Sequence, residues 1–120
     1  MKFYFKQREI HGQSKIITIF EDEKYISLED ILNFELISVD EIIDKVDSVM
    51  LGKSSLQEIG NERCLISVTK DGIEISDLFE GIIDDDELYP VVKLSNDEFR
   101  KFLLNWKKQK ESFMYSTDNL

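Results

Sequence analysis

CLISVTKDGIEI, residues 64–75, carries the clearest structural signal in this 120-residue chain. Apolar and polar residues alternate on both sides of Asp71-Gly72, as they do in strands with one buried face. An Asp-Gly pair between two β-branched runs is the strongest short-range signal for a hairpin turn. The stretch therefore predicts an antiparallel hairpin that continues to about residue 78, with Cys64 as a small buried residue.

An amphipathic helix is predicted before this hairpin. Ser38 and Glu41 form a capping box, and the apolar residues that follow repeat with the period of an α-helix. Gly52 is a suitable residue for the position just past a helix end. We expect this helix over residues 39–51. Residues 53–61, which join it to the hairpin, resemble a polar loop anchored by Leu56 and Ile59.

A second amphipathic helix is predicted near the end of the chain. Ser95 and Glu98 form another capping box, which predicts a helix over about residues 96–112. Its apolar stripe consists of Phe99, Phe102, Leu103 and Trp106. We expect residues 113–115 to fold back onto this helix and residues 116–120 to form a flexible tail.

The first twenty residues predict another hairpin, because two strand-like runs flank the turn-like residues 11–14. Residues 89–94 predict a further strand, with Pro90 at its start. Residues 25–37 fit a helix or a strand, and we favour a short helix opened by Ser27 and Asp30.

These elements predict one α+β domain over residues 1–115. Its mostly antiparallel sheet is built from the two hairpins plus a further strand, and it carries two main amphipathic helices. The hydrophobic fraction of 42% is enough for a folded core despite a charged fraction of 33%.

Charge is distributed very unevenly along the chain, whose net charge is -10. Residues 21–98 carry 22 acids against 6 bases, whereas the segments before and after them are mildly basic. The negative electrostatic field of this acidic middle segment repels nucleic acid and anionic membrane and attracts a basic protein. Acidity can also serve solubility alone.

An acidic surface in this middle region is therefore the candidate site for a protein partner. Carboxylates would pair with the partner's Lys and Arg, while an exposed aromatic side chain, Phe79 or Tyr89, would contribute central contacts. The candidate residues are Asp40, Asp44, Asp47, Glu74, Asp77, Glu80, Asp84, Asp85, Asp86, Glu87 and Tyr89.

The residues needed for catalysis are scarce. His11 is the only histidine and lies in a predicted turn, and Cys64 is the only cysteine, which excludes an intramolecular disulfide. Residues 84–87 lack the alternating spacing of an EF-hand loop. We therefore expect a non-catalytic protein without metal or cofactor.

The start of the chain, MKFYFK, lacks the apolar run of a signal peptide, and no stretch is long enough to span a membrane. With a single cysteine, these features predict a cytoplasmic protein that binds neither membrane nor nucleic acid. The sequence allows a homo-oligomer but does not indicate one.

The hairpin around residues 64–75, the acidic connection to Tyr89-Pro90 and the helix opened by LSNDEF, residues 94–99, together resemble small bacterial immunity proteins. The resemblance covers residues 62–112 and concerns systems such as contact-dependent growth inhibition. It implies a small, acidic, cytoplasmic, non-enzymatic protein that blocks the active site of a cognate toxin domain or an adjacent surface. The acidic surface itself would suit the positive substrate groove of a nuclease, so we expect the toxin to be basic and a nuclease. The alternative is a scaffold or adaptor, or a self-associating module, that acts through an exposed sheet edge or through apolar contacts.

Overall fold

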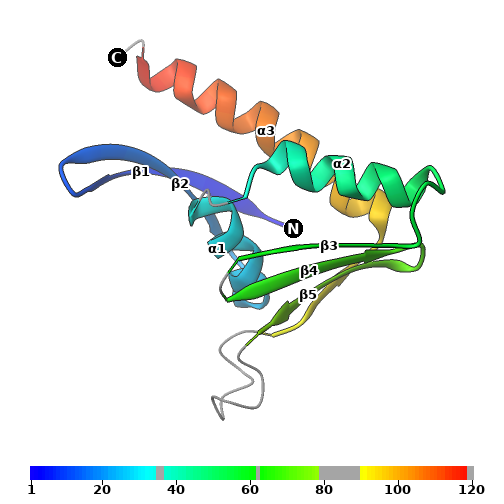
Figure 1. The fold of residues 1–120 in the computed structure, drawn as a ribbon. Coiled ribbons are helices and arrows are strands. Elements are labelled where there is room, and N and C mark those ends of the chain that lie inside the picture. The colour runs from blue at the N-terminus through cyan, green and yellow to red at the C-terminus, as the bar shows by residue number, and fades with distance from the viewer. Residues whose placement is uncertain (35–36, 62, 79–89, 119–120) are drawn as a thin grey trace.

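The computed structural model describes residues 1–34, 37–61, 63–78 and 90–118. In chain order the elements are β1 (Phe3–Ile10), β2 (Gln13–Phe20), a 3₁₀ turn (Glu23–Tyr25), α1 (Ile26–Phe34), α2 (Val39–Met50), β3 (Leu56–Gly60), β4 (Cys64–Thr69), β5 (Gly72–Asp77), β6 (Val92–Leu94) and α3 (Asn96–Asp118). The predicted α+β class is confirmed. The two hairpins lie in separate antiparallel sheets, one of β1-β2 and one ordered β3-β4-β5-β6 (Figure 1).

The hairpin β4–β5 forms as the sequence predicts, with Ile66 opposite Ile75 and Thr69 opposite Gly72. The two residues between the strands are Lys70 and Asp71, so the turn lies one residue earlier than Asp-Gly. Gly72 has a φ of 135°, and a Cβ there would lie 2.6 Å from the carbonyl oxygen of Leu94. The glycine therefore allows β6 to approach β5 closely.

The predicted loop over residues 53–61 is wrong for its second half, which forms the edge strand β3. Gln57 and Ile59 are half-buried and point toward the helices, while Leu56 and Glu58 are exposed. The alternation of apolar and polar residues in the sequence is weak, because the exposed Leu56 is apolar and the half-buried Gln57 is polar. The strand forms because its backbone pairs with β4, Ile59 lying opposite Ile66. Cross-strand pairing of this kind depends on residues that are distant in sequence.

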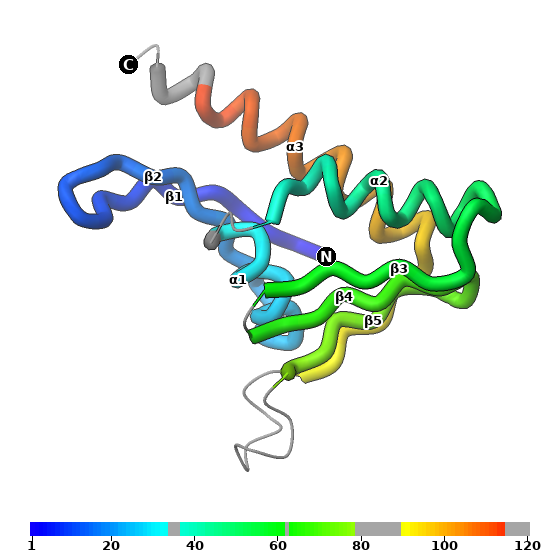
Figure 2. The backbone as a smooth tube through the Cα atoms, in the orientation of Figure 1, coloured from blue at the N-terminus to red at the C-terminus, as the bar shows by residue number. Residues whose placement is uncertain are grey.

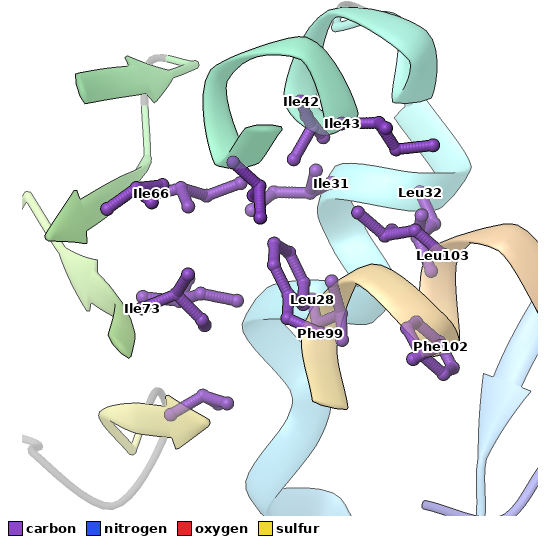
Figure 3. Close-up of a cluster of buried hydrophobic side chains, with 14 of the residues drawn as sticks. Leu28, Ile31, Leu32, Ile42, Ile43, Ile66, Ile73, Phe99, Phe102 and Leu103 are labelled. Atoms are coloured by element: carbon purple, nitrogen blue, oxygen red, sulfur yellow. The ribbon is translucent and has the colours of Figure 1, made fainter. Parts of the chain in front are cut away.

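Three helices cover one face of the four-stranded sheet (Figure 1). The inward residues of β4 and β5 are fully or almost fully buried, and side chains from α1, α2 and α3 converge on Ile66 and Ile73 (Figure 3). Leu28, Ile42 and Phe99 are completely inaccessible to solvent at the centre of this cluster. Burying one such side chain stabilises the fold by about 1.5–3 kcal/mol.

The segment that fitted either a helix or a strand forms helix α1. Its start differs from the prediction, because the 3₁₀ turn begins three residues before Ile26 and Asp22 caps it by accepting a hydrogen bond from the Lys24 backbone N–H, at 3.0 Å. Ser27 is buried inside the helix instead of capping it. Residues 35 and 36 of this predicted segment lie outside the described residues.

The helices α2 and α3 begin where their capping boxes predict. The Ser95 hydroxyl accepts a hydrogen bond from the Glu98 backbone N–H at 3.1 Å, whereas Ser38 makes no side-chain cap bond. Gly52 follows α2 with a φ of 76°. The predicted end of the last helix is wrong: α3 continues to Asp118, so residues 113–115 do not fold back and residues 116–118 are helical.

The hairpin β1–β2 extends sideways from the body of the molecule, toward the same side as the C-terminal half of α3 (Figure 2). Aromatic rings attach its base to that helix, with ring centroids 5.4 Å apart for Phe3 and Phe102 and 6.4 Å for Phe5 and Trp106. The Trp106 indole N–H also donates to the Thr18 hydroxyl at 2.8 Å, with both residues buried. The outer half, through the turn at His11-Gly12, is exposed.

Candidate protein-binding surface

Two of the predicted partner-binding acids on α2, Asp40 and Asp47, form ion pairs within the molecule. The Arg100 Nε lies 2.6 Å from an oxygen of Asp47, and Lys107 pairs with Asp40. The hydrogen bond and the charge of Asp47 raise the pKa of the Arg100 guanidinium above its already high value. Both ion pairs link α2 to α3, so these carboxylates have a structural role.

Asp77 is also engaged within the fold. Its carboxylate lies 3.0 Å from the Arg63 Nε, and the neighbouring guanidinium nitrogen donates to it at 3.2 Å. Because Asp77 lies opposite Cys64 at the end of the hairpin, the pair closes the open end of β4–β5. Its side chain is only 14% exposed, which leaves little of the carboxylate for a partner.

The structure separates the remaining two described acids. Asp44 is exposed on α2, the helix that lies over β3 and β4. Glu74 is exposed on β5 and alternates with the buried Ile73 and Ile75, so it points away from the helices. Asp44 and Glu74 therefore lie on opposite sides of the sheet, and the predicted acids do not form one continuous patch.

The side of the sheet that bears Glu74 is uncovered by any described helix (Figure 1). We call it the open face. It consists of the outward residues Leu56, Glu58 and Gly60 of β3, Leu65, Ser67 and Thr69 of β4, Gly72, Glu74 and Ser76 of β5, and Lys93 of β6.

One cross-strand row of the open face is polar and charged. The register places Glu58 opposite Ser67, Ser67 opposite Glu74, and Glu74 opposite Lys93. No described residue forms an ion pair with either glutamate. Leu56, 48% exposed, adds an apolar side chain near the β3 edge. The row therefore presents carboxylates next to apolar surface, a combination that suits a protein partner.

A shallow hollow of about 460 Å³ lies at one end of the open face. Ser67, Glu74 and Lys93 line it on the sheet, and Asp71 and Glu98 line it from the adjoining turn and helix. Three carboxylates and one ammonium therefore surround a space large enough for a side chain of a partner. The hollow suits a cation, such as a lysine or arginine side chain.

Sequence reasoning missed Glu58 and Leu56 as surface residues of this site, because residues 53–61 read as a loop. No periodicity in the sequence of β3 could have revealed them, because its exposed Leu56 is apolar and its half-buried Gln57 is polar. The remaining candidates lie outside the described residues: Phe79, Glu80, Asp84, Asp85, Asp86, Glu87 and Tyr89.

The other chemistry-bearing residues stand apart from the open face. His11 lies in the turn of the first hairpin with a φ of 52°. Cys64 is completely buried, and burial, followed by the nearby Asp30 and Asp77, raises the pKa of its thiol to about 11. Within the described residues, His, Cys, Asp and Glu form no cluster of three or more that could hold a metal ion. None of the described helices is both long and apolar enough to cross a membrane.

Comparison of the chain with protein-family models, curated proteins and solved structures finds no match.

Proposed function

We propose that this protein is a non-catalytic inhibitor that binds a basic partner protein, as immunity proteins bind their toxins, and that the open face is its binding surface. The observation that carries the proposal is the uncovered sheet face with its exposed row of Glu58 and Glu74. A sheet face can cover the active-site groove of a nuclease or a similar basic domain without catalytic residues of its own.

Electrostatics favour this surface over the helical side. Asp40 and Asp47 of α2 are already neutralised by Lys107 and Arg100, whereas Glu58 and Glu74 are not paired within the described chain. Carboxylates without an ion pair keep more of their attraction for a basic partner, although Lys93 lies opposite Glu74. The net charge of -10 adds long-range steering, which raises association rates by about 10- to 1,000-fold at low salt.

Apolar contacts would supply most of the lasting affinity. Protein interfaces depend on a few central anchors surrounded by polar residues, and Leu56 and the half-buried Leu65 are the apolar side chains of the open face. We expect the charged row to control how fast the partner binds and these leucines to control how slowly it leaves.

The experiment begins with the coding sequences beside this gene, because immunity proteins are encoded next to their toxins. A basic C-terminal domain from a neighbouring large protein would be expressed in bacteria with this protein or with its variants. The wild type should restore growth. The Glu58→Lys/Glu74→Lys double variant should fail to protect and should bind the purified toxin domain at least about tenfold more slowly at low salt.

Asp44→Lys/Glu111→Lys is the matched control, because it makes the same change in net charge at exposed positions on α2 and α3. It should protect as well as the wild type. Circular dichroism would verify that both variants are folded. Full protection by the Glu58/Glu74 variant, or equal loss in the control, would show that the open face is not the binding surface.

A further inference from the structure

The strand β2 has one edge that no other described strand occupies, because within the described residues β1 and β2 form a sheet of their own. Near the body of the molecule, side chains of α1 form hydrogen bonds with the backbone groups of this edge. The Thr18 N–H donates to the Asn33 side-chain oxygen at 2.7 Å, the Asn33 side-chain nitrogen donates to the Thr18 carbonyl at 2.8 Å, and the Phe20 N–H donates to Glu29 at 2.9 Å.

Asn33 therefore imitates one residue of a neighbouring strand, since it offers one donor and one acceptor to the same backbone residue. These bonds also establish which residues of β2 face the free edge. In an antiparallel pair, alternate residues direct both backbone groups to the same side, so Ser14 and Ile16 face the free edge together with Thr18. No described residue bonds to the backbone of Ser14 or Ile16 there.

A groove of about 550 Å³ lies along this unoccupied part of the edge. Ile10, Ile16 and Ile17 of the hairpin and Met114 of α3 give it an apolar lining. Lys15 and Lys110 are its cations and Asp30 its single carboxylate. An extended polypeptide in the groove would meet unpaired backbone groups, apolar side chains and an excess of positive charge.

We propose that this edge receives an extended segment of a partner protein, which adds as a third strand beside Ser14–Ile16 and carries an acidic residue opposite Lys15. This site is separate from the open face and does not depend on the function proposed for it. Strand addition is a common mode of peptide recognition, in which the backbone provides affinity and the side chains provide specificity.

Charge decides against a second copy of the chain as the third strand. Two copies of β2 can pair symmetrically through both Ser14 and Ile16 only in the register that sets Lys15 against its own counterpart. Like charges directly opposite each other destabilise a strand pair. Arg8, which lies opposite Lys15 in the hairpin, increases the local positive charge. An acidic residue in the added strand would remove this repulsion.

The edge can be tested by amide hydrogen exchange and NMR titration with a defined probe, the acetylated peptide Thr-Val-Glu-Val-Thr. In the free protein the Thr18 and Phe20 amides should exchange slowly and those of Ser14 and Ile16 rapidly. The peptide at millimolar concentration should protect the Ser14 and Ile16 amides by at least tenfold. The same peptide with Lys in place of Glu should bind at least about tenfold more weakly.

Lys15→Glu is the decisive variant, because it should reverse this preference and make the Lys peptide the tighter ligand. Ser14→Pro, which removes one edge-facing N–H, should abolish protection, whereas Ser14→Ala should retain it. The proposal would be overturned if millimolar peptide changed neither the NMR chemical shifts nor the exchange rates of the Ser14 and Ile16 amides, or if the Glu and Lys peptides bound equally. A concentration-dependent dimer that protects the same amides would overturn the choice of occupant.

Discussion

Thr18→Val tests how the hairpin β1–β2 is held to the rest of the molecule. The Thr18 hydroxyl accepts the Trp106 indole N–H at 2.8 Å, and the two side chains are 1% and 5% exposed. Valine has nearly the same shape as threonine, so the substitution removes the acceptor without creating a cavity. It leaves the indole N–H buried without a partner.

A buried polar group that loses its partner costs about 1–3 kcal/mol. We expect the upper half of this range, because solvent reaches neither residue well enough to replace the hydroxyl. For a domain of 120 residues, a loss of about 2–3 kcal/mol lowers the melting temperature by roughly 8–12 °C. Urea denaturation monitored by Trp106 fluorescence, the signal of the only tryptophan, measures the free energy directly.

A double-mutant cycle with Trp106→Phe separates this hydrogen bond from the packing of the indole ring. Trp106→Phe leaves the Thr18 hydroxyl buried and also removes ring contacts, so circular dichroism must replace fluorescence for that arm. The double variant contains neither half of the pair. Its destabilisation should fall short of the sum of the single effects by about 1 kcal/mol or more. Additive effects, or a Thr18→Val variant as stable as the wild type, would refute the reasoning.

Two further predictions concern a glycine and the buried thiol. Gly72→Ala should destabilise the fold more than Gly12→Ala in urea denaturation, because a Cβ at Gly72 would lie 2.6 Å from the Leu94 carbonyl oxygen. At Gly12, with a φ of 77°, a Cβ would meet nothing within 4 Å, so the substitution would cost only about 1–2 kcal/mol of backbone strain. Equal effects of the two substitutions would contradict the close approach of β6. The fold raises the pKa of the Cys64 thiol from 9.0 to about 11, so the thiol ionises at lower pH in the unfolded chain. Between these pH values the unfolded state binds fewer protons than the folded state, and the free energy of unfolding falls as pH rises. The free energy of unfolding of Cys64→Ala should decline less steeply over this range, and parallel pH profiles of variant and wild type would contradict the predicted shift.

Local signals in the sequence predicted most of the elements. The hairpin around Asp71-Gly72 and the helices opened by Ser38 and Ser95 depend on residues within a few positions of one another. They form where expected, except that the turn of the hairpin lies one residue earlier than Asp-Gly. The start of α1 was missed because Asp22, rather than Ser27, provides the cap of the preceding 3₁₀ turn. The end of α3 was missed because Phe113, expected to leave the helix, packs on Phe5 with ring centroids 5.7 Å apart.

Long-range pairing explains the larger errors. The strand β3 has little periodicity of its own and exists because β4 offers it a backbone edge. The separation of the two hairpins into different sheets likewise depends on helix α1, whose Asn33 and Glu29 side chains occupy the edge of β2 at Thr18 and Phe20. No pattern in the sequence of the first hairpin indicates that side chains of α1, instead of another strand, will form hydrogen bonds with the edge of β2.

The candidate site shows most clearly what charge counting can and cannot predict. Asp40, Asp47 and Asp77 contribute to the net charge exactly as much as Glu58 and Glu74 do, yet each of the three neutralises a base elsewhere in the fold. Two of these bases, Arg100 and Lys107, belong to the mildly basic C-terminal segment. The contrast between basic ends and an acidic middle therefore serves partly to attach α3 to α2. Glu58 and Glu74 have no such base within the described residues, and both are exposed on the sheet face opposite the helices, which is why the proposed binding surface lies there.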